Sequence, residues 1–189
     1  MDDPSIFGLD QEQIDVTRKV ASLAIMTAVA VSTNYLLIGV VNIKLMDLIV
    51  FTGGYLYGPS FGSGLGILIW LVYGTLNPYG FSFPTLVATS LSETIYGIFG
   101  NIYRKYLEGE NGFSSSLKLG ILGFLLTFIY DLVTNILTAF VIGIPIFTVL
   151  ITGIPFAIMH QVSNAIFFAV GFPPLIQALR INRVVEEIE

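Results

Sequence analysis

The sequence lacks cysteine altogether, contains a single histidine and a single tryptophan, and is poor in charged residues. Without cysteine there is no disulfide framework, no thiolate metal site and no cysteine nucleophile. Charged residues make up 11% of the chain, against about 25% in ordinary soluble domains, and this is too few to cover a solvated surface. The net charge of −5 argues against a nucleic-acid partner, because phosphate binding requires a clustered basic surface.

Hydrophobic residues are abundant instead: they form 54% of the 189 residues, and the mean hydropathy is +0.84. At about 20 residues for each crossing of a bilayer core about 30 Å thick, this length allows about six helical spans. We therefore predict an all-α integral membrane bundle of six transmembrane helices, forming a single transmembrane domain over residues 1–189. Acidic residues precede the first apolar run and no small-residue cleavage pattern follows it, so we expect the first helix to be retained.

Turn and breaker residues divide the apolar sequence into these spans. The predicted spans are about 20–41, 43–58, 60–77, 83–103, 118–143 and 151–179. Residues 1–17 form either a short interfacial helix or a frayed terminus. Glycines and Pro59 interrupt the stretch 47–77, which predicts two short helices joined tightly, with a re-entrant hairpin as the alternative. Gly143–Pro145 and Gly153–Pro155 are expected to bracket a turn before the sixth span.

The basic residues predict the orientation, because lysine and arginine in short loops favour the cytoplasm. With both termini inside, only Lys44 faces outward. The other basic residues then lie on the cytoplasmic side: Arg18, Lys19, Arg104, Lys105, Lys118, Arg180 and Arg183. A re-entrant hairpin over 47–77 leaves the sides of the later loops unchanged. We predict a multi-pass protein of the cell membrane with cytoplasmic N and C termini.

Ionisable residues within the spans are costly in lipid and are usually functional or paired. Glu93, Asp131 and His160 are all expected near the midplane, and polar residues follow at helical spacing on the same faces. Polar groups that converge in an aromatic cavity are typical of a small-molecule site. The candidate substrate-binding residues are Asn34, Asn42, Glu93, Asp131, Asn135, His160 and Asn164. The candidate aromatic walls are Tyr57, Trp70, Tyr73, Tyr79, Tyr96 and Tyr130.

Three other interpretations of these residues stay open. They could form interhelical hydrogen bonds only, with a buried neutral His160 donating to Asp131. An intramembrane enzyme could use Glu93, Asp131 and His160, although no nucleophile–base motif accompanies them. A structural membrane protein of an envelope assembly would need no cavity. No metal site is expected, because no ligand pair lies at helical spacing on one helix. No cofactor and no catalytic residue is expected.

Small residues line one stripe of the first span, and Ala24 and Ala28 form a small-xxx-small pattern. Such a stripe allows another helix backbone to approach closely. The stripe is therefore either a packing surface within the bundle or a docking surface for a partner protein.

Taken together, these features resemble the substrate-binding (S) components of energy-coupling factor (ECF) vitamin transporters. The resemblance covers nearly the whole chain. It rests on the Ala24–Ala28 pattern, the polar loop Asn42–Asp47, the glycine-rich turn Gly58–Gly64, the Asp131–Asn135 pair and the His160–Asn164 pair.

The resemblance implies a subunit that captures a vitamin or vitamin precursor from outside and delivers it inward with a transmembrane coupling protein and ATPases. Ala24 and Ala28 would dock the coupling protein. The sequence contains no Walker A motif, so this subunit would bind the substrate without hydrolysing ATP. The substrate stays open: Glu93 and Asp131 suit a cationic or hydrogen-bond-donating heterocycle, whereas an anionic ligand would rest on Lys44. Thiamine-like pyrimidines, flavins and deazapurines all fit.

Overall fold

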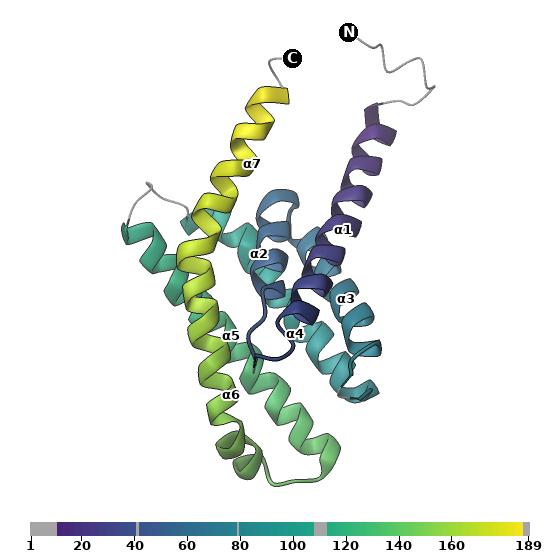
Figure 1. Ribbon diagram of the computed structural model, residues 1–189, viewed down its shortest axis with the longest axis vertical. Helices are drawn as coiled ribbons and strands as arrows, with labels where there is room; N and C mark the ends of the chain where they lie inside the picture. The colour runs from purple at the N-terminus through teal and green to yellow at the C-terminus, as the bar shows by residue number, and fades with distance from the viewer. Residues whose placement is uncertain (1–10, 41, 79, 108–112, 187–189) are drawn as a thin grey trace.

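The protein is all-helical throughout the part that the computed structural model describes, residues 11–40, 42–78, 80–107 and 113–186. Its helices are α1 (Gln11–Leu36), α2 (Met46–Tyr57), α3 (Pro59–Thr75), α4 (Phe83–Ile102), α5 (Phe113–Ile142), α6 (Ile146–Ile166) and α7 (Phe172–Glu186). The π-helical turn η2 (Tyr103–Leu107) extends α4, and the π-helical turn η3 (Phe167–Gly171) joins α6 and α7 into one continuous rod (Figure 1). The prediction of an all-α fold is confirmed.

Among the residues that the structure describes, three helical segments are long and apolar enough to cross a membrane: Asp15–Leu36, Phe113–Ile142 and Ile146–Leu179. Helices α2 and α3 contain only 12 and 17 residues. At 1.5 Å per residue they reach about 18 Å and 26 Å, which is less than the thickness of the hydrocarbon core. The start of α1 and the end of α7 lie at one end of the molecule, and the α5–α6 connection lies at the other (Figure 1).

The helix ends differ from the sequence-based expectation in several places. Residues 11–17 belong to α1 itself and do not form a separate interfacial helix, while residues 1–10 lie outside the described residues. The chain leaves α1 at Leu36, before the predicted end at 41. The prediction that Gly143–Pro145 and Gly153–Pro155 bracket a turn is wrong at its second end, because Gly153 and Pro155 both lie inside α6. Neighbouring helices let an apolar membrane helix tolerate glycine and proline in its interior, so only the segment at Gly143–Pro145, where Gly143 has φ 68°, turns the chain.

Helices α2, α3 and α4 form a tightly packed unit, which we call the glycine core. Gly54 of α2, Gly62 of α3 and Gly97 of α4 meet where the helices cross. A Cβ atom built on any one of them would lie less than 3 Å from the backbone of another. Small residues permit this direct backbone contact, which explains why the segment 47–77 is so rich in glycine.

Helices α5, α6 and α7 form a second unit, which we call the arm. Gly120 and Gly123 bring α5 against Ala165 and Phe168 of the α6–η3 rod. Aromatic contacts then join the arm to the glycine core, and the ring centres of Phe51 and Phe168 are 4.9 Å apart. The outer end of the arm extends beyond the rest of the bundle (Figure 1), and residues 141–148 are all exposed.

Candidate functional site

A cavity of about 430 Å³ opens where the end of α1 meets the connection to α2, residues 37–45, which we call loop 1. This volume lies in the usual range for small-molecule sites, about 300–1,000 Å³. The cavity lies between the glycine core and the arm. Its lining residues are Asn34, Leu37, Ile38, Gly39, Val40, Asn42, Ile43, Lys44, Trp70, Tyr73, Asn77 and Phe156.

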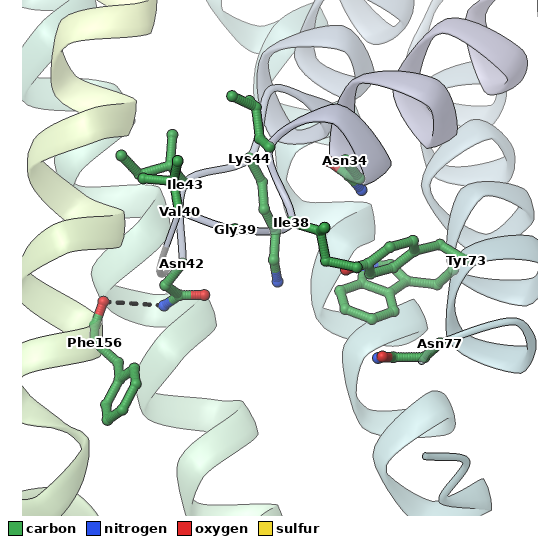
Figure 2. Close-up of a pocket in the computed structure, with 12 residues that line it drawn as sticks. Asn34, Ile38, Gly39, Val40, Asn42, Ile43, Lys44, Tyr73, Asn77 and Phe156 are labelled. Atoms are coloured by element: carbon green, nitrogen blue, oxygen red, sulfur yellow. Dashed lines mark hydrogen bonds between the residues drawn. The ribbon is translucent and has the colours of Figure 1, made fainter. Parts of the chain in front are cut away.

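Loop 1 supplies polar groups to the cavity. Figure 2 shows the Lys44 side chain reaching from loop 1 into this space, and its Nζ atom lies 4.9 Å from the centre of the Trp70 ring. Asn42 has φ 53°, in the left-handed region that asparagine enters more readily than most residues. Its Nδ2 atom donates a hydrogen bond of 3.0 Å to the carbonyl oxygen of Phe156 (Figure 2). Loop 1 is thereby attached to helix α6 of the arm.

The opposite wall of the cavity is aromatic and comes from α3. Trp70 and Tyr73 lie about one turn apart on this helix, and their ring centres are separated by 5.7 Å. Tyr35 of α1 packs edge-on against Tyr73 at 5.6 Å. The Trp70 Nε1 atom donates a 3.0 Å hydrogen bond to Glu93 Oε2 on α4. This bond orients the indole, so its ring forms a fixed surface of the cavity.

Behind this wall lies a buried network centred on His160 of α6. Its Nδ1 atom is 2.8 Å from Asp131 Oδ1 of α5, and its Nε2 atom is 2.8 Å from Asp47 Oδ2 of α2. A neutral imidazole has only one N–H donor, whereas an imidazolium has two. The two short contacts therefore require one more proton than a neutral ring with two carboxylates provides, and this proton can reside on the ring or on a carboxyl group.

Asn164 extends this network by one helical turn. Its Nδ2 atom donates to Asp47 Oδ2 at 2.5 Å and to Thr127 Oγ1 at 2.7 Å. The Tyr96 hydroxyl of α4 also donates to Thr127 Oγ1, and the Thr127 hydroxyl donates in turn to the Gly123 carbonyl. Side chains from α2, α4, α5 and α6 are thus joined by buried hydrogen bonds, which we call the polar clasp.

The buried acids outnumber the basic groups around them. Asp47, Glu93 and Asp131 are at most 7% exposed, and each has one carboxylate oxygen without a hydrogen-bond partner. Ionised groups without a partner are costly in an apolar interior, so these oxygens are positions where a further proton or donor is stabilising. Within the described ranges, no group of at least three His, Cys, Asp or Glu side chains is arranged to hold a metal ion.

The sequence-predicted site residues lie in the cavity, directly behind Trp70 or in the polar clasp, with one exception. Asn34 and Asn42 line the cavity, and Glu93 lies directly behind Trp70. Asp131, His160 and Asn164 belong to the polar clasp, where His160 bonds to Asp131 as the interpretation of interhelical hydrogen bonding expects. Asn135 is the exception and lies in none of these places: it is half-buried and its amide faces Gly153 of α6.

The predicted aromatic walls also separate in the structure. Trp70 and Tyr73 line the cavity, while Tyr96 and Tyr130 are buried beside the polar clasp. The hydroxyl of Tyr57 is hydrogen-bonded to Ser22 of α1. Tyr79 lies outside the described residues.

Sequence reasoning missed Asp47 as a member of the site, because it treated this residue as the end of a polar loop. In the structure Asp47 lies in the first turn of α2 and is 1% exposed. A carboxylate at the start of an apolar helix is a recognisable signal, since the helix dipole favours negative charge there. Thr127 carried no comparable signal, because its role depends on the contact between α5 and α6.

The family model described as the S component of the ECF-type riboflavin transporter matches residues 15–181. No curated protein and no solved structure shows a significant match.

Proposed function

Because the chain belongs to the family of ECF-type riboflavin transporter S components, we propose that it binds riboflavin from outside the cell and releases it inward together with a coupling protein and ATPases. S components are membrane-embedded transporter subunits and not enzymes. The cavity between loop 1, α1, α3 and α6 is the proposed substrate site.

The composition of this cavity is the observation that carries the proposal. A flavin is a planar ring system with carbonyl and N–H groups along one edge. The Trp70 and Tyr73 rings offer apolar surface for the ring. Asn34 Nδ2 already donates to Met46 Sδ and Asn42 Nδ2 to the Phe156 carbonyl, so the amide oxygen of Asn42 and the second N–H of each amide are the groups offered to its edge. Glu93, Asp131, His160 and Asn164 act behind this wall by holding Trp70 and the helices in position.

Riboflavin binding to the purified chain tests this proposal directly. Flavin fluorescence should be quenched on titration, because a ring stacked on tryptophan loses its emission. Trp70→Ala should weaken binding at least tenfold, and Tyr57→Ala is the matched control, since Tyr57 contacts Ser22 away from the cavity. A folded wild-type chain that fails to bind riboflavin would contradict the proposal.

We further propose that the chain crosses the membrane six times as one domain, with cytoplasmic termini and with loop 1 outside. The absence of cysteine makes this accessible to labelling. Ile144→Cys, at the α5–α6 connection, should react with an impermeant maleimide on intact cells. Ser114→Cys, at the start of α5, should react only after the membrane is opened. The reverse pattern would overturn the orientation.

The exposed stripe on α1 supports a docking role for Ala24 and Ala28. Both side chains are exposed, as are Thr17 and Ala21 on the same stripe, so none of them is used for packing within the bundle. Ala28→Trp should leave riboflavin binding intact and block co-purification with the coupling protein. Ala28→Ser keeps the surface small and should preserve the complex. Loss of the fold in Ala28→Trp would assign the stripe to internal packing.

A further inference from the structure

Lys44 differs from every other basic side chain that the structure describes, because it lines the proposed substrate cavity. It is half-buried, and its ammonium group lies over the face of Trp70. We propose that Lys44 sets the charge selectivity of the cavity, so that neutral, carbonyl-rich rings bind and cationic heterocycles are rejected. This inference rests on the proposed function.

The surface of Trp70 that faces the cavity is already occupied by the Lys44 ammonium group. The indole is oriented by its hydrogen bond to Glu93, so its cavity face cannot turn away. A planar ligand that stacks on this face takes the place where the Lys44 ammonium now makes its cation–π contact. The ligand and the ammonium group therefore compete for one surface, and binding requires Lys44 to move aside within the cavity.

The Lys44 ammonium group needs a hydrogen-bond acceptor once a ligand has displaced it from Trp70. An ammonium group that loses its aromatic partner and is covered by a bound ligand is also cut off from water, and this is costly unless it meets an acceptor. A ring with carbonyl oxygens along its edge supplies that acceptor. A ring with a fixed positive charge supplies none and is repelled by Lys44 at short distance. The same residue thus favours one class of ligand and disfavours the other.

The buried acids Asp47, Glu93 and Asp131 are the groups that could attract a cationic ligand instead. None of the three lines the cavity. Asp47 and Asp131 are engaged by His160, and Glu93 is reached through Trp70. The positive charge is therefore the one that an entering ligand meets first. This arrangement favours the neutral flavins over the cationic heterocycles among the ligands that the sequence left open.

The experiment compares riboflavin, which is neutral, with thiamine, which is cationic, on the purified full chain. Lys44→Met keeps a chain of similar length without charge, and Lys44→Arg keeps the charge. Lys118→Met is the matched control, because Lys118 is an exposed lysine at the start of α5. The wild type should bind riboflavin at least 100-fold more tightly than thiamine. Lys44→Met should narrow that ratio at least tenfold, while Lys44→Arg and Lys118→Met should keep it.

Two results would overturn the inference: an unchanged ratio in folded Lys44→Met, or a wild type that binds thiamine as tightly as riboflavin. The second measurement needs no variant, so the inference stays testable even if Lys44→Met does not fold. A wild type that binds neither compound would contradict the proposed function itself. If the wild type binds riboflavin but Lys44→Met has the same ratio of riboflavin to thiamine affinity, only the role of Lys44 is contradicted.

Discussion

The glycine core and the arm are assembled by different physical means. In the glycine core, backbones touch through Gly54, Gly62 and Gly97, with no side chain between them. The arm is joined to that core by the polar clasp around His160 and by aromatic contacts such as Phe51–Phe168. Direct backbone contact permits one relative position of the helices, whereas hydrogen bonds between side chains can break and form again at modest cost.

The cavity lies between these two units, and each contributes one wall. Trp70 and Tyr73 belong to α3 of the glycine core, while Phe156 belongs to α6 of the arm. The aromatic wall is therefore fixed in place, and the opposite wall is held by bonds that can open. If the cavity holds the proposed substrate, we expect its entry and release to involve motion of the arm and loop 1 and not repacking of the glycine core.

The largest effect is expected from a side chain introduced into the glycine core. Gly97→Leu places its side chain against the backbone of α3, which the crossing cannot accommodate. We expect the free energy of unfolding to fall by more than about 4 kcal/mol, so that the chain fails to fold. Size-exclusion chromatography and thermal unfolding in detergent measure this. Gly64→Ala is the control, because a Cβ atom on Gly64 meets nothing within 4 Å. If both variants elute and unfold alike, helices α3 and α4 can move apart at their crossing without loss of the fold.

A smaller loss is expected from opening the polar clasp. His160→Ala leaves the carboxylates of Asp47 and Asp131 buried without their shared partner, which costs about 3 kcal/mol. The chain should still fold, with a lower midpoint of thermal unfolding. Asn135→Ala, on the neighbouring helix α5 but outside the clasp, should cost about 0.6 kcal/mol. If both variants lose a similar free energy of unfolding, His160 is not the residue that holds the polar clasp together.

The division between the two units also explains what the sequence could and could not predict. Helices and their approximate limits follow from apolar runs and breakers, and the glycines between 47 and 77 indicate short helices in close contact. The pairing of His160 with Asp131 was accessible as well, because both are ionisable residues near the middle of apolar spans.

Contacts between residues far apart in the sequence could not be predicted from these local patterns. Asp47 and His160 are 113 residues apart, and the hydrogen bond between them exists only because α2 and α6 become neighbours. The turn at Gly153–Pro155 was predicted wrongly because local breaker signals are overridden inside a packed membrane helix. Lys44 was predicted to be the outward-facing basic residue, but its contact with Trp70 depends on how loop 1 folds back over α3.

The smallest effect is expected where loop 1 is attached to the arm. Asn42→Gly retains the left-handed backbone at φ 53° but removes both the hydrogen bond to Phe156 and the amide offered to the flavin edge. Loss of the Phe156 bond alone should cost about 1 kcal/mol, which corresponds to release of bound riboflavin roughly fivefold faster, and loss of the amide contact adds to this. Stopped-flow fluorescence during displacement measures the release rate.

Asn42→Ala separates the hydrogen bond from the backbone conformation at the same position. Alanine loses the bond to Phe156 and is also strained at positive φ, by about 1 kcal/mol more than glycine. Release from Asn42→Ala should therefore be faster than from Asn42→Gly. If both variants release riboflavin at the wild-type rate, loop 1 is not held by its bond to α6. The movable wall of the cavity would then be limited to the arm itself.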